Sequence, residues 1–272
     1  GRDALRASRR NESSRCALRR LEARRGAFTR LGPGLSKALV IAHRGASAHR
    51  PENTLPAFEL AVAQRADMIE TDLHRTRDGA IVITHDEDLS GLGGRGEIAG
   101  ATLAEILALD AGGGERVPTL DEILDRFGPR IAFNLELKRA TDADYDGLEA
   151  QALDAVKARG LLGRTLWSSF YDTVLARLRA LAPDARVGLL ISSRYPIRIV
   201  ERARELDAEA IHPEASVVSE ALVEEAHAVG LAVYVFTVDD PAQMERLLAL
   251  GVDGLFTNHP DRMRTLVDRP RA

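Results

Sequence analysis

Short runs of apolar residues alternate along the chain with longer segments in which apolar residues recur every three or four positions. Strand-length runs that alternate with amphipathic helix patterns are typical of repeated βα units around a parallel sheet. The runs predict eight strands, which cover Leu39–His43, Met68–His74, Arg130–Lys138, Thr165–Ser169, Arg186–Ile191, Ala210–Pro213, Ala232–Thr237 and Asp253–Thr257. Eight such units within residues 38–272 predict an α/β fold, the TIM (β/α)8 barrel, rather than a doubly wound sheet.

The segment between the second and third predicted strands is longer than one connecting helix requires. It spans 55 residues, 75–129, and predicts a small insertion over about residues 75–118. The insertion begins with a turn sequence, Asp78-Gly79, and an apolar run, 80–84. We therefore expect a hairpin in which the chain folds back along the second strand.

The register of this hairpin is expected to bring a histidine to the second strand. With Asp78 and Gly79 as a two-residue turn, the pairing places His85 opposite Asp72. Directly opposed residues have Cβ atoms roughly 4.5–5.5 Å apart, so His85 is expected beside the Asp72 carboxylate.

The composition narrows the class of protein. The chain of 272 residues is 45% hydrophobic and 29% charged, as in a soluble globular protein. It has no apolar run of about 18 residues, which excludes a transmembrane helix, and its single cysteine, Cys16, cannot form an internal disulfide.

Residues 38–272 carry 26 Lys/Arg and 38 Asp/Glu, and this acidic body disfavours nucleic acid as a partner. A small substrate or a metal suits it better.

Residues 1–37 differ from the rest of the chain. They carry 11 Lys/Arg and 3 Asp/Glu and few large apolar residues, so we interpret them as a basic tail without a core of its own. No apolar stretch of about 7 to 15 residues marks a secretory signal, and the default expectation for localisation is cytoplasmic. A transit peptide or translated sequence upstream of the true start remains an alternative for this segment.

Polar side chains cluster at the C-terminal ends of the predicted strands, where TIM barrels carry their reactive groups. Strand side chains alternate with period two, so Glu70 and Asp72 share one face, as do Glu136 and Lys138 on the next strand. The seven residues expected to converge on one pocket are His43, Arg44, Glu70, Asp72, His85, Glu136 and Lys138.

Three of these residues can bind a metal. Glu70, Asp72 and Glu136 offer carboxylate oxygens and no thiolate, which suits one hard divalent cation, Mg²⁺ or Ca²⁺, better than zinc. Apolar residues around Glu70 and Asp72 indicate a buried segment, where carboxylates need a cationic partner.

The other residues of the set suit acid–base chemistry on an anion. His43 and His85 can act as general acid and general base, in an order that the sequence leaves open. Arg44 and Lys138 can hold an anionic group, although Lys138 is equally suited to a structural ion pair with Glu136. Together with a metal, this set predicts cleavage of a phosphodiester.

Several neighbouring residues are expected to have supporting roles. Glu52 is expected to brace the first loop, and Asp86 and His74 to be structural. His212 ends the sixth predicted strand and can face the pocket.

Seven segments, in order along the chain, resemble the glycerophosphodiester phosphodiesterase family of TIM-barrel hydrolases, over roughly residues 39–265. They are His43-Arg44-Gly45 with Pro51-Glu52-Asn53-Thr54, Ile69-Glu70-Thr71-Asp72-Leu73, Arg77-Asp78-Gly79 with His85-Asp86, Leu135-Glu136-Leu137-Lys138, Ser168-Ser169-Phe170, Thr237-Val238, and Asp253-Gly254-Leu255-Phe256-Thr257-Asn258.

The resemblance implies hydrolysis of a glycerophosphodiester to glycerol 3-phosphate and an alcohol. It implies that the two histidines form the acid–base pair, that the three carboxylates bind the metal and that the arginine contacts phosphate. It further implies that Phe236, where many members of the family have a tryptophan near the glycerol, contacts the substrate. Cleavage through attack by the glycerol's own hydroxyl, with a cyclic phosphate before water enters, is also implied.

Two other functions compete with this interpretation. A lysophospholipase D would need an apolar groove for an acyl chain or a membrane-docking segment, and residues 88–115 offer little apolar surface for either. A barrel that binds a phosphate ligand without turnover would need to have lost a reactive group, and none is missing from the set. The oligomeric state and the preferred alcohol are left open.

Overall fold

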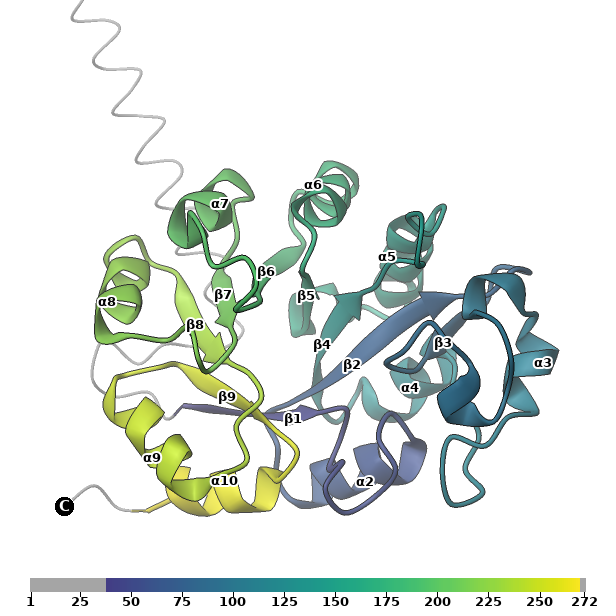
Figure 1. Cartoon of the computed structure of the whole chain (residues 1–272), viewed down its shortest axis with the longest axis horizontal. Helices are drawn as coiled ribbons and strands as arrows, with labels where there is room; N and C mark the ends of the chain where they lie inside the picture. Colours follow the sequence, from purple (N-terminus) through teal and green to yellow (C-terminus); the bar gives the residue numbers. More distant parts are fainter. Residues whose placement is uncertain (1–37, 270–272) are drawn as a thin grey trace, which may run out of the picture. The chain divides into compact units, whose positions relative to one another are not determined.

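Eight parallel strands close into a barrel in the computed structural model, which describes residues 38–269 (Figure 1). The barrel strands are β1 (Leu39–His43), β2 (Met68–Arg75), β4 (Ala132–Leu137), β5 (Thr165–Ser169), β6 (Arg186–Ile191), β7 (Ala210–Pro213), β8 (Ala232–Val235) and β9 (Gly254–Thr257). β1 pairs with both β2 and β9, which closes the sheet. The TIM barrel predicted from the sequence is confirmed. The predicted basic tail, residues 1–37, lies outside the described residues.

One helix follows each barrel strand, on the outside of the barrel (Figure 1). These helices are α2 (Leu55–Ala63), α4 (Leu120–Phe127), α5 (Leu148–Ala158), α6 (Asp172–Leu181), α7 (Ile199–Glu205), α8 (Glu220–Ala228), α9 (Pro241–Ala249) and α10 (Pro260–Val267). Local sequence sets several of their starts. At α4, for example, the Thr119 side chain accepts from the Glu122 amide while the Glu122 carboxylate accepts from the Thr119 amide, a capping box.

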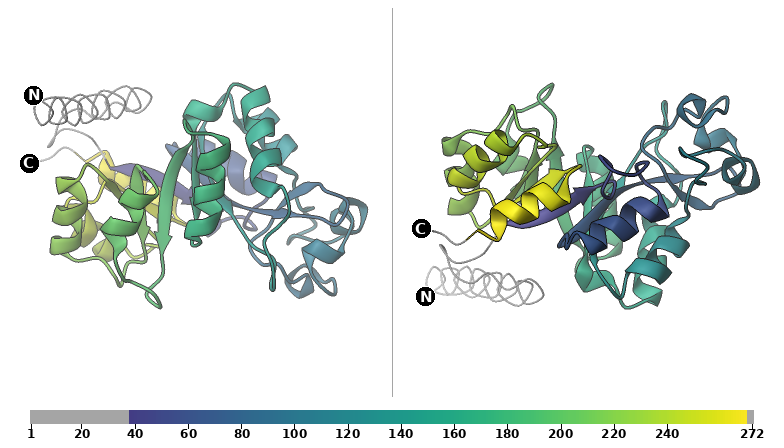
Figure 2. Two further views of the ribbon diagram at one scale, coloured as in Figure 1. Left: turned by 90° about the horizontal axis from the view of Figure 1, so that it is seen from above. Right: turned by 90° about the horizontal axis from the view of Figure 1, so that it is seen from below.

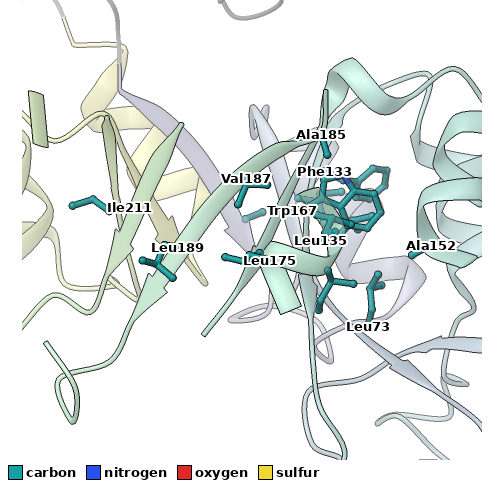
Figure 3. Packing of buried hydrophobic residues seen from close by; sticks show 14 of the residues in the cluster. Leu73, Phe133, Leu135, Ala152, Trp167, Leu175, Ala185, Val187, Leu189 and Ile211 are labelled. Atoms are coloured by element: carbon teal, nitrogen blue, oxygen red, sulfur yellow. The ribbon is translucent and has the colours of Figure 1, made fainter. Parts of the chain in front are cut away.

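The strands bury both of their faces, which is why they read as continuous apolar runs. One set of alternate side chains packs outward against the helices. Figure 3 labels members of this cluster, among them Phe133 of β4, Trp167 of β5 and Leu175 of α6. The other set fills the barrel interior and includes Ile41 and Met68. Polar residues then occupy the inward positions nearer the C-terminal ends of the strands.

The insertion predicted between strands 2 and 3 is present, between β2 and α4. It contains β3 (Ile81–Ile83), the short 3-10 helices η2 (Ser90–Leu92) and η3 (Ile98–Gly100), and α3 (Leu103–Leu107). Outside the insertion, a further 3-10 turn, η4 (Leu162–Arg164), precedes β5. The insertion lies to one side of the barrel, beyond β2 and β4, in both views of Figure 2. β3 pairs antiparallel with β2, so the chain folds back as expected.

The predicted register of this hairpin is wrong by one residue. Leu73 pairs with Ile83 and His74 with Val82, and the ladder does not reach His85. The turn has three central residues instead of two, because the Thr76 amide bonds to the Ala80 carbonyl and Gly79 adopts a φ of 92°. A three-residue hairpin loop uses such a left-handed glycine, which the Asp-Gly sequence alone does not distinguish from a two-residue turn.

Several strand ends lie one or two residues inside the predicted bounds. The amides of Arg130 and Ile131 bond to the Phe127 carbonyl, so these two residues belong to the turn after α4 and not to β4. At the end of β8, Phe236 forms only an isolated bridge with Glu214.

Among the helices described between residues 38 and 269, none combines the length and apolar character needed to span a membrane.

Candidate active site

Three carboxylates meet inside the C-terminal end of the barrel. Glu70 and Asp72 project inward from β2 and Glu136 from β4, where Asp72 and Glu136 are direct neighbours in the sheet. One oxygen from each lies within 4.8 Å of the others. Their side chains are 5%, 1% and 10% exposed, respectively. The group of three predicted from strand alternation therefore exists, and it is buried.

Two cations hold this acidic cluster. The Lys138 Nζ lies 2.9 Å from Asp72 Oδ1 and 2.8 Å from Glu136 Oε1, so the structural ion pair expected for Lys138 is present and includes a second carboxylate. Arg44 contacts the second oxygen of Asp72, with Nε 3.5 Å from Oδ2. The Arg44 Nη1 donates to both oxygens of Glu52 at 3.0 Å, so Glu52 braces this loop as expected.

The three carboxyl groups differ in their ease of ionisation. Burial raises the pKa of Glu70 well above its ordinary value, and the charges of Asp72 and Glu136 add to that effect. Burial also raises the pKa of Glu136 against the opposing attraction of Lys138. Burial acts in the same sense on Asp72, but Lys138 and Arg44 outweigh it and lower the pKa of that carboxyl. Three carboxylates thus share two cations, and Glu70 lacks full compensation.

His43, the last residue of β1, lies against Glu70. Its Nε2 is 4.0 Å from Glu70 Oε2, while Nδ1 lies 2.8 Å from Asn258 Oδ1. The Asn258 Nδ2 donates to Asp239 Oδ2 at 2.7 Å, which fixes the amide with its oxygen toward the ring. Nδ1 is therefore the donor and Nε2 the nitrogen with a free lone pair. Burial, followed by the charge of Arg44, lowers the pKa of His43 to about 4.

His85 belongs to the loop after β3, near the same acidic cluster. Its Nδ1 lies 2.7 Å from Asp86 Oδ1, and its charge acts on both Asp72 and His43. The buried His74 supports this loop, because its Nε2 is 3.1 Å from the His85 carbonyl oxygen and its Nδ1 is 2.8 Å from the Tyr145 hydroxyl. His85 is thus close enough to Asp72 for their charges to interact, although the strand register that predicted their direct pairing was wrong.

Aromatic side chains line the barrel where β8 and β9 end. Phe236 follows directly after β8 and is half-buried, with edge-to-face contacts to Phe170 at 5.8 Å and to Phe256 at 6.4 Å between ring centroids. That His212 can face the pocket stays a prediction. His212 is fully buried beside the rings of Tyr234 and Phe256, and neither ring nitrogen has a hydrogen-bond partner among residues 38–269.

Sequence reasoning missed the amides that orient the reactive groups. The Asn53 Nδ2 donates to Asp72 Oδ2 at 2.9 Å, and its Oδ1 accepts from the Thr71 hydroxyl at 2.7 Å. Asn258 performs the corresponding role for His43. The position of Asn258 in the sequence could have identified it, because it directly follows β9 and thus lies at the C-terminal end of a barrel strand.

A closed (β/α)8 barrel with acidic and basic side chains gathered at the C-terminal ends of its strands defines a TIM-barrel enzyme. Residues 43–262 match the profile of the glycerophosphoryl diester phosphodiesterase family, and the chain belongs to that family. It is accordingly a hydrolase of the glycerophosphodiester phosphodiesterase class.

Relatives with known names agree with this assignment. A glycerophosphodiester phosphodiesterase from Caldanaerobacter subterraneus is 37% identical over 85% of this chain and 98% of its own length. A Bacillus subtilis protein of the same name is 33% identical over 83% of this chain and 85% of its own.

Solved structures extend the agreement to the fold. A phosphodiesterase from Oleispira antarctica, solved in complex with the product sn-glycerol-3-phosphate, is 33% identical, with a TM-score of 0.75 over 84% of this chain and 96% of that one. A glycerophosphodiester phosphodiesterase from Parabacteroides distasonis has a TM-score of 0.76 at 27% identity, over 86% of this chain and 98% of that one.

Proposed function

We propose that the protein hydrolyses small glycerophosphodiesters to glycerol 3-phosphate and an alcohol, at the pocket formed by the C-terminal ends of β1, β2 and β4. The observation that carries this proposal is the meeting of Glu70, Asp72 and Glu136 within 4.8 Å, with His43 4.0 Å from Glu70 and His85 close enough for its charge to act on Asp72 and His43. The Oleispira antarctica relative binds sn-glycerol-3-phosphate, the product expected from this reaction.

The donor chemistry of the acidic cluster fits one divalent metal ion. Glu70, Asp72 and Glu136 would supply the protein ligands, and an all-oxygen set of this kind suits Mg²⁺ or Ca²⁺. The raised pKa of Glu70 marks a carboxyl whose charge the protein's own cations leave uncompensated. When bound, such a metal would withdraw negative charge from the phosphoryl oxygens of the substrate.

The two histidines would move the protons of the reaction. One removes the proton from the attacking oxygen, and the other protonates the alcohol oxygen as its bond to phosphorus breaks. In both rings Nδ1 faces an acceptor, Asn258 Oδ1 for His43 and Asp86 Oδ1 for His85. Nε2 is therefore the nitrogen that each ring offers to the substrate.

The cations and the aromatic side chain would place the diester. Arg44 and Lys138 lie on two sides of Asp72 and can attract the phosphate, with Arg44 held in place by Glu52. Phe236, half-buried at the end of β8, would cover the apolar edge of the glycerol.

Comparing substrates tests the proposal. Glycerol 3-phosphate release from glycerophosphocholine and choline release from lysophosphatidylcholine should be measured on the full chain with Mg²⁺ or Ca²⁺. We expect faster turnover of the water-soluble diester and its loss in His43→Ala. A preference for the lysolipid would contradict the proposed substrate class, and tight binding of the diester without turnover would contradict catalysis.

A further inference from the structure

A second group of metal-ligating side chains lies outside the acidic pocket. His49 belongs to the turns after β1, His259 directly precedes α10, and Asp261 is in the first turn of that helix. One ligand atom from each lies within 4.8 Å of the others. The proposed hydrolysis uses none of these three residues.

The spacing of the group is close to that of a coordination site. The His49 Nε2 is 3.3 Å from Asp261 Oδ1, and the rings of His49 and His259 meet edge to face with centroids 5.3 Å apart. Tetrahedral zinc with metal–ligand distances of about 2.0–2.1 Å places its donor atoms roughly 3.3 Å apart. The His49–Asp261 edge of such a site therefore already has this spacing, and a ligand atom of His259 lies within 4.8 Å of both.

Backbone hydrogen bonds hold the two contributing segments next to each other. The Ala48 amide donates to the Asn258 carbonyl at 3.1 Å, and the His49 amide donates to the Ala46 carbonyl at 3.0 Å. On the other side, the His259 amide donates to the Thr257 hydroxyl at 3.0 Å. The ligands are thus presented by fixed backbone positions, which reduces the ordering that metal binding would require.

His259 carries an unused ligand atom. Its Nδ1 is buried and has no hydrogen-bond partner among residues 38–269. A buried ring nitrogen without a partner is unfavourable, and coordination to a metal is one way to satisfy it. Burial lowers the pKa of His259, with Arg262 and His49 acting in the same sense and Asp239 and Asp261 opposing them, so the ring is held in the neutral form that binds metals.

The ligand types select a different class of cation from the acidic pocket. Two imidazole nitrogens and one carboxylate suit Zn²⁺ and other late first-row transition metals, whereas three carboxylates suit Mg²⁺ or Ca²⁺. The His49 and Asp261 side chains are 36% and 44% exposed, so a metal here remains open to water at its fourth position.

We propose that His49, His259 and Asp261 form a second cation site, for Zn²⁺ or a related transition metal, that links the turns after β1 to the start of α10. A metal at this site cross-links two segments that are 210 residues apart in the sequence. Because it binds the folded chain and not the unfolded one, it raises the melting temperature.

Zinc titration of the full chain tests this site. Calorimetry should compare a Glu70→Gln, Glu136→Gln double variant, which weakens the acidic pocket, with the same protein carrying His259→Gln in addition. We expect the double variant to retain one zinc equivalent, and His259→Gln to weaken that binding at least tenfold. His227→Gln is the matched control, because His227 pairs with Asp253 at 2.8 Å and belongs to no three-ligand group found among residues 38–269.

Thermal unfolding and diffraction provide independent readouts. Zinc should raise the melting temperature of the double variant and of its His227→Gln form, and this rise should disappear with His259→Gln. Anomalous scattering at the zinc edge should place an ion between His49 and Asp261 in wild-type crystals. Equal zinc affinity with and without His259, or an ion located only at the acidic pocket, would overturn the proposal, whatever the outcome of the hydrolysis assays.

Discussion

At the scale of single residues, the pocket depends on side chains that act through others. Asp239 accepts from Asn258, and Asn258 Oδ1 faces His43 Nδ1, so a carboxylate outside the pocket fixes which nitrogen of His43 carries its hydrogen. Asn53 has a similar orienting role for Asp72, because its Nδ2 donates to Asp72 Oδ2 at 2.9 Å. Removing such a residue leaves the reactive group present but incorrectly oriented.

Asn258→Ala tests this positioning role. We expect kcat to fall about 10- to 100-fold with little change in KM, because the substrate still binds while His43 loses its orientation. Ser47→Ala is the control, since the Ser47 hydroxyl donates to the same Asn258 oxygen at 2.7 Å but does not touch the His43 ring nitrogen. Steady-state kinetics at one fixed pH measures both variants, and an unchanged kcat in Asn258→Ala would contradict the role.

At the scale of elements, the hairpin of β2 and β3 delivers His85 to the pocket. Its turn needs Gly79, whose φ of 92° is costly for any residue with a Cβ, and an added Cβ would also meet the Arg75 guanidinium at 3.0 Å. The His74 side chain then holds the loop that follows, through the His85 carbonyl at 3.1 Å. The hairpin thus links a local backbone requirement to the geometry of the site.

Gly79→Ala should destabilise the fold by about 1–2 kcal/mol. Gly91→Ala is the matched control, because Gly91 belongs to the same insertion but has no positive φ and no atom within 4 Å of an added Cβ. Urea unfolding of the two variants and the wild type measures the difference. Equal free energies of unfolding for both glycine variants would show that the turn conformation carries no energetic cost.

Sequence patterns predicted the elements better than their pairing. The eight strands were predictable because parallel strands buried on both faces are continuous apolar runs, and strand alternation was sufficient to bring Glu70, Asp72 and Glu136 together. The hairpin register was not predictable, since the difference between a two- and a three-residue turn depends on the backbone angle of Gly79. The contact of His43 with Asn258 was not predictable either, because the two residues are 215 positions apart and only closure of the barrel brings them together.

At the scale of the whole molecule, buried neutral histidines make the fold sensitive to acid. Burial lowers the pKa of His212 from 6.5 to about 3, and that of His43 and His74 to about 4. Between pH 6.5 and about 4 the unfolded chain therefore binds protons that the folded chain does not. The free energy of unfolding falls as the pH falls through this window, by on the order of 1–3 kcal/mol for each histidine.

His212→Leu should flatten this pH dependence. The substitution removes one group that gains a proton on unfolding, so the variant should lose less stability than the wild type between pH 6.5 and 4. Ile211→Val, one position earlier in β7, changes the core without removing a titratable group and should keep the wild-type slope. Chemical unfolding at several pH values gives the slopes, and a wild-type slope in His212→Leu would contradict the assignment of a neutral buried ring.

The central claim is that the three buried carboxylates form the metal-dependent site of glycerophosphodiester hydrolysis. Its most direct test is the rate of glycerol 3-phosphate release from glycerophosphocholine by the wild type, Glu136→Gln and the surface control Glu220→Gln, each with Mg²⁺, Ca²⁺ or chelator. We predict release by the wild type and Glu220→Gln only with a metal, and a loss of about 100-fold or more in Glu136→Gln. Full activity in chelator, or an unchanged rate in Glu136→Gln, would contradict the claim.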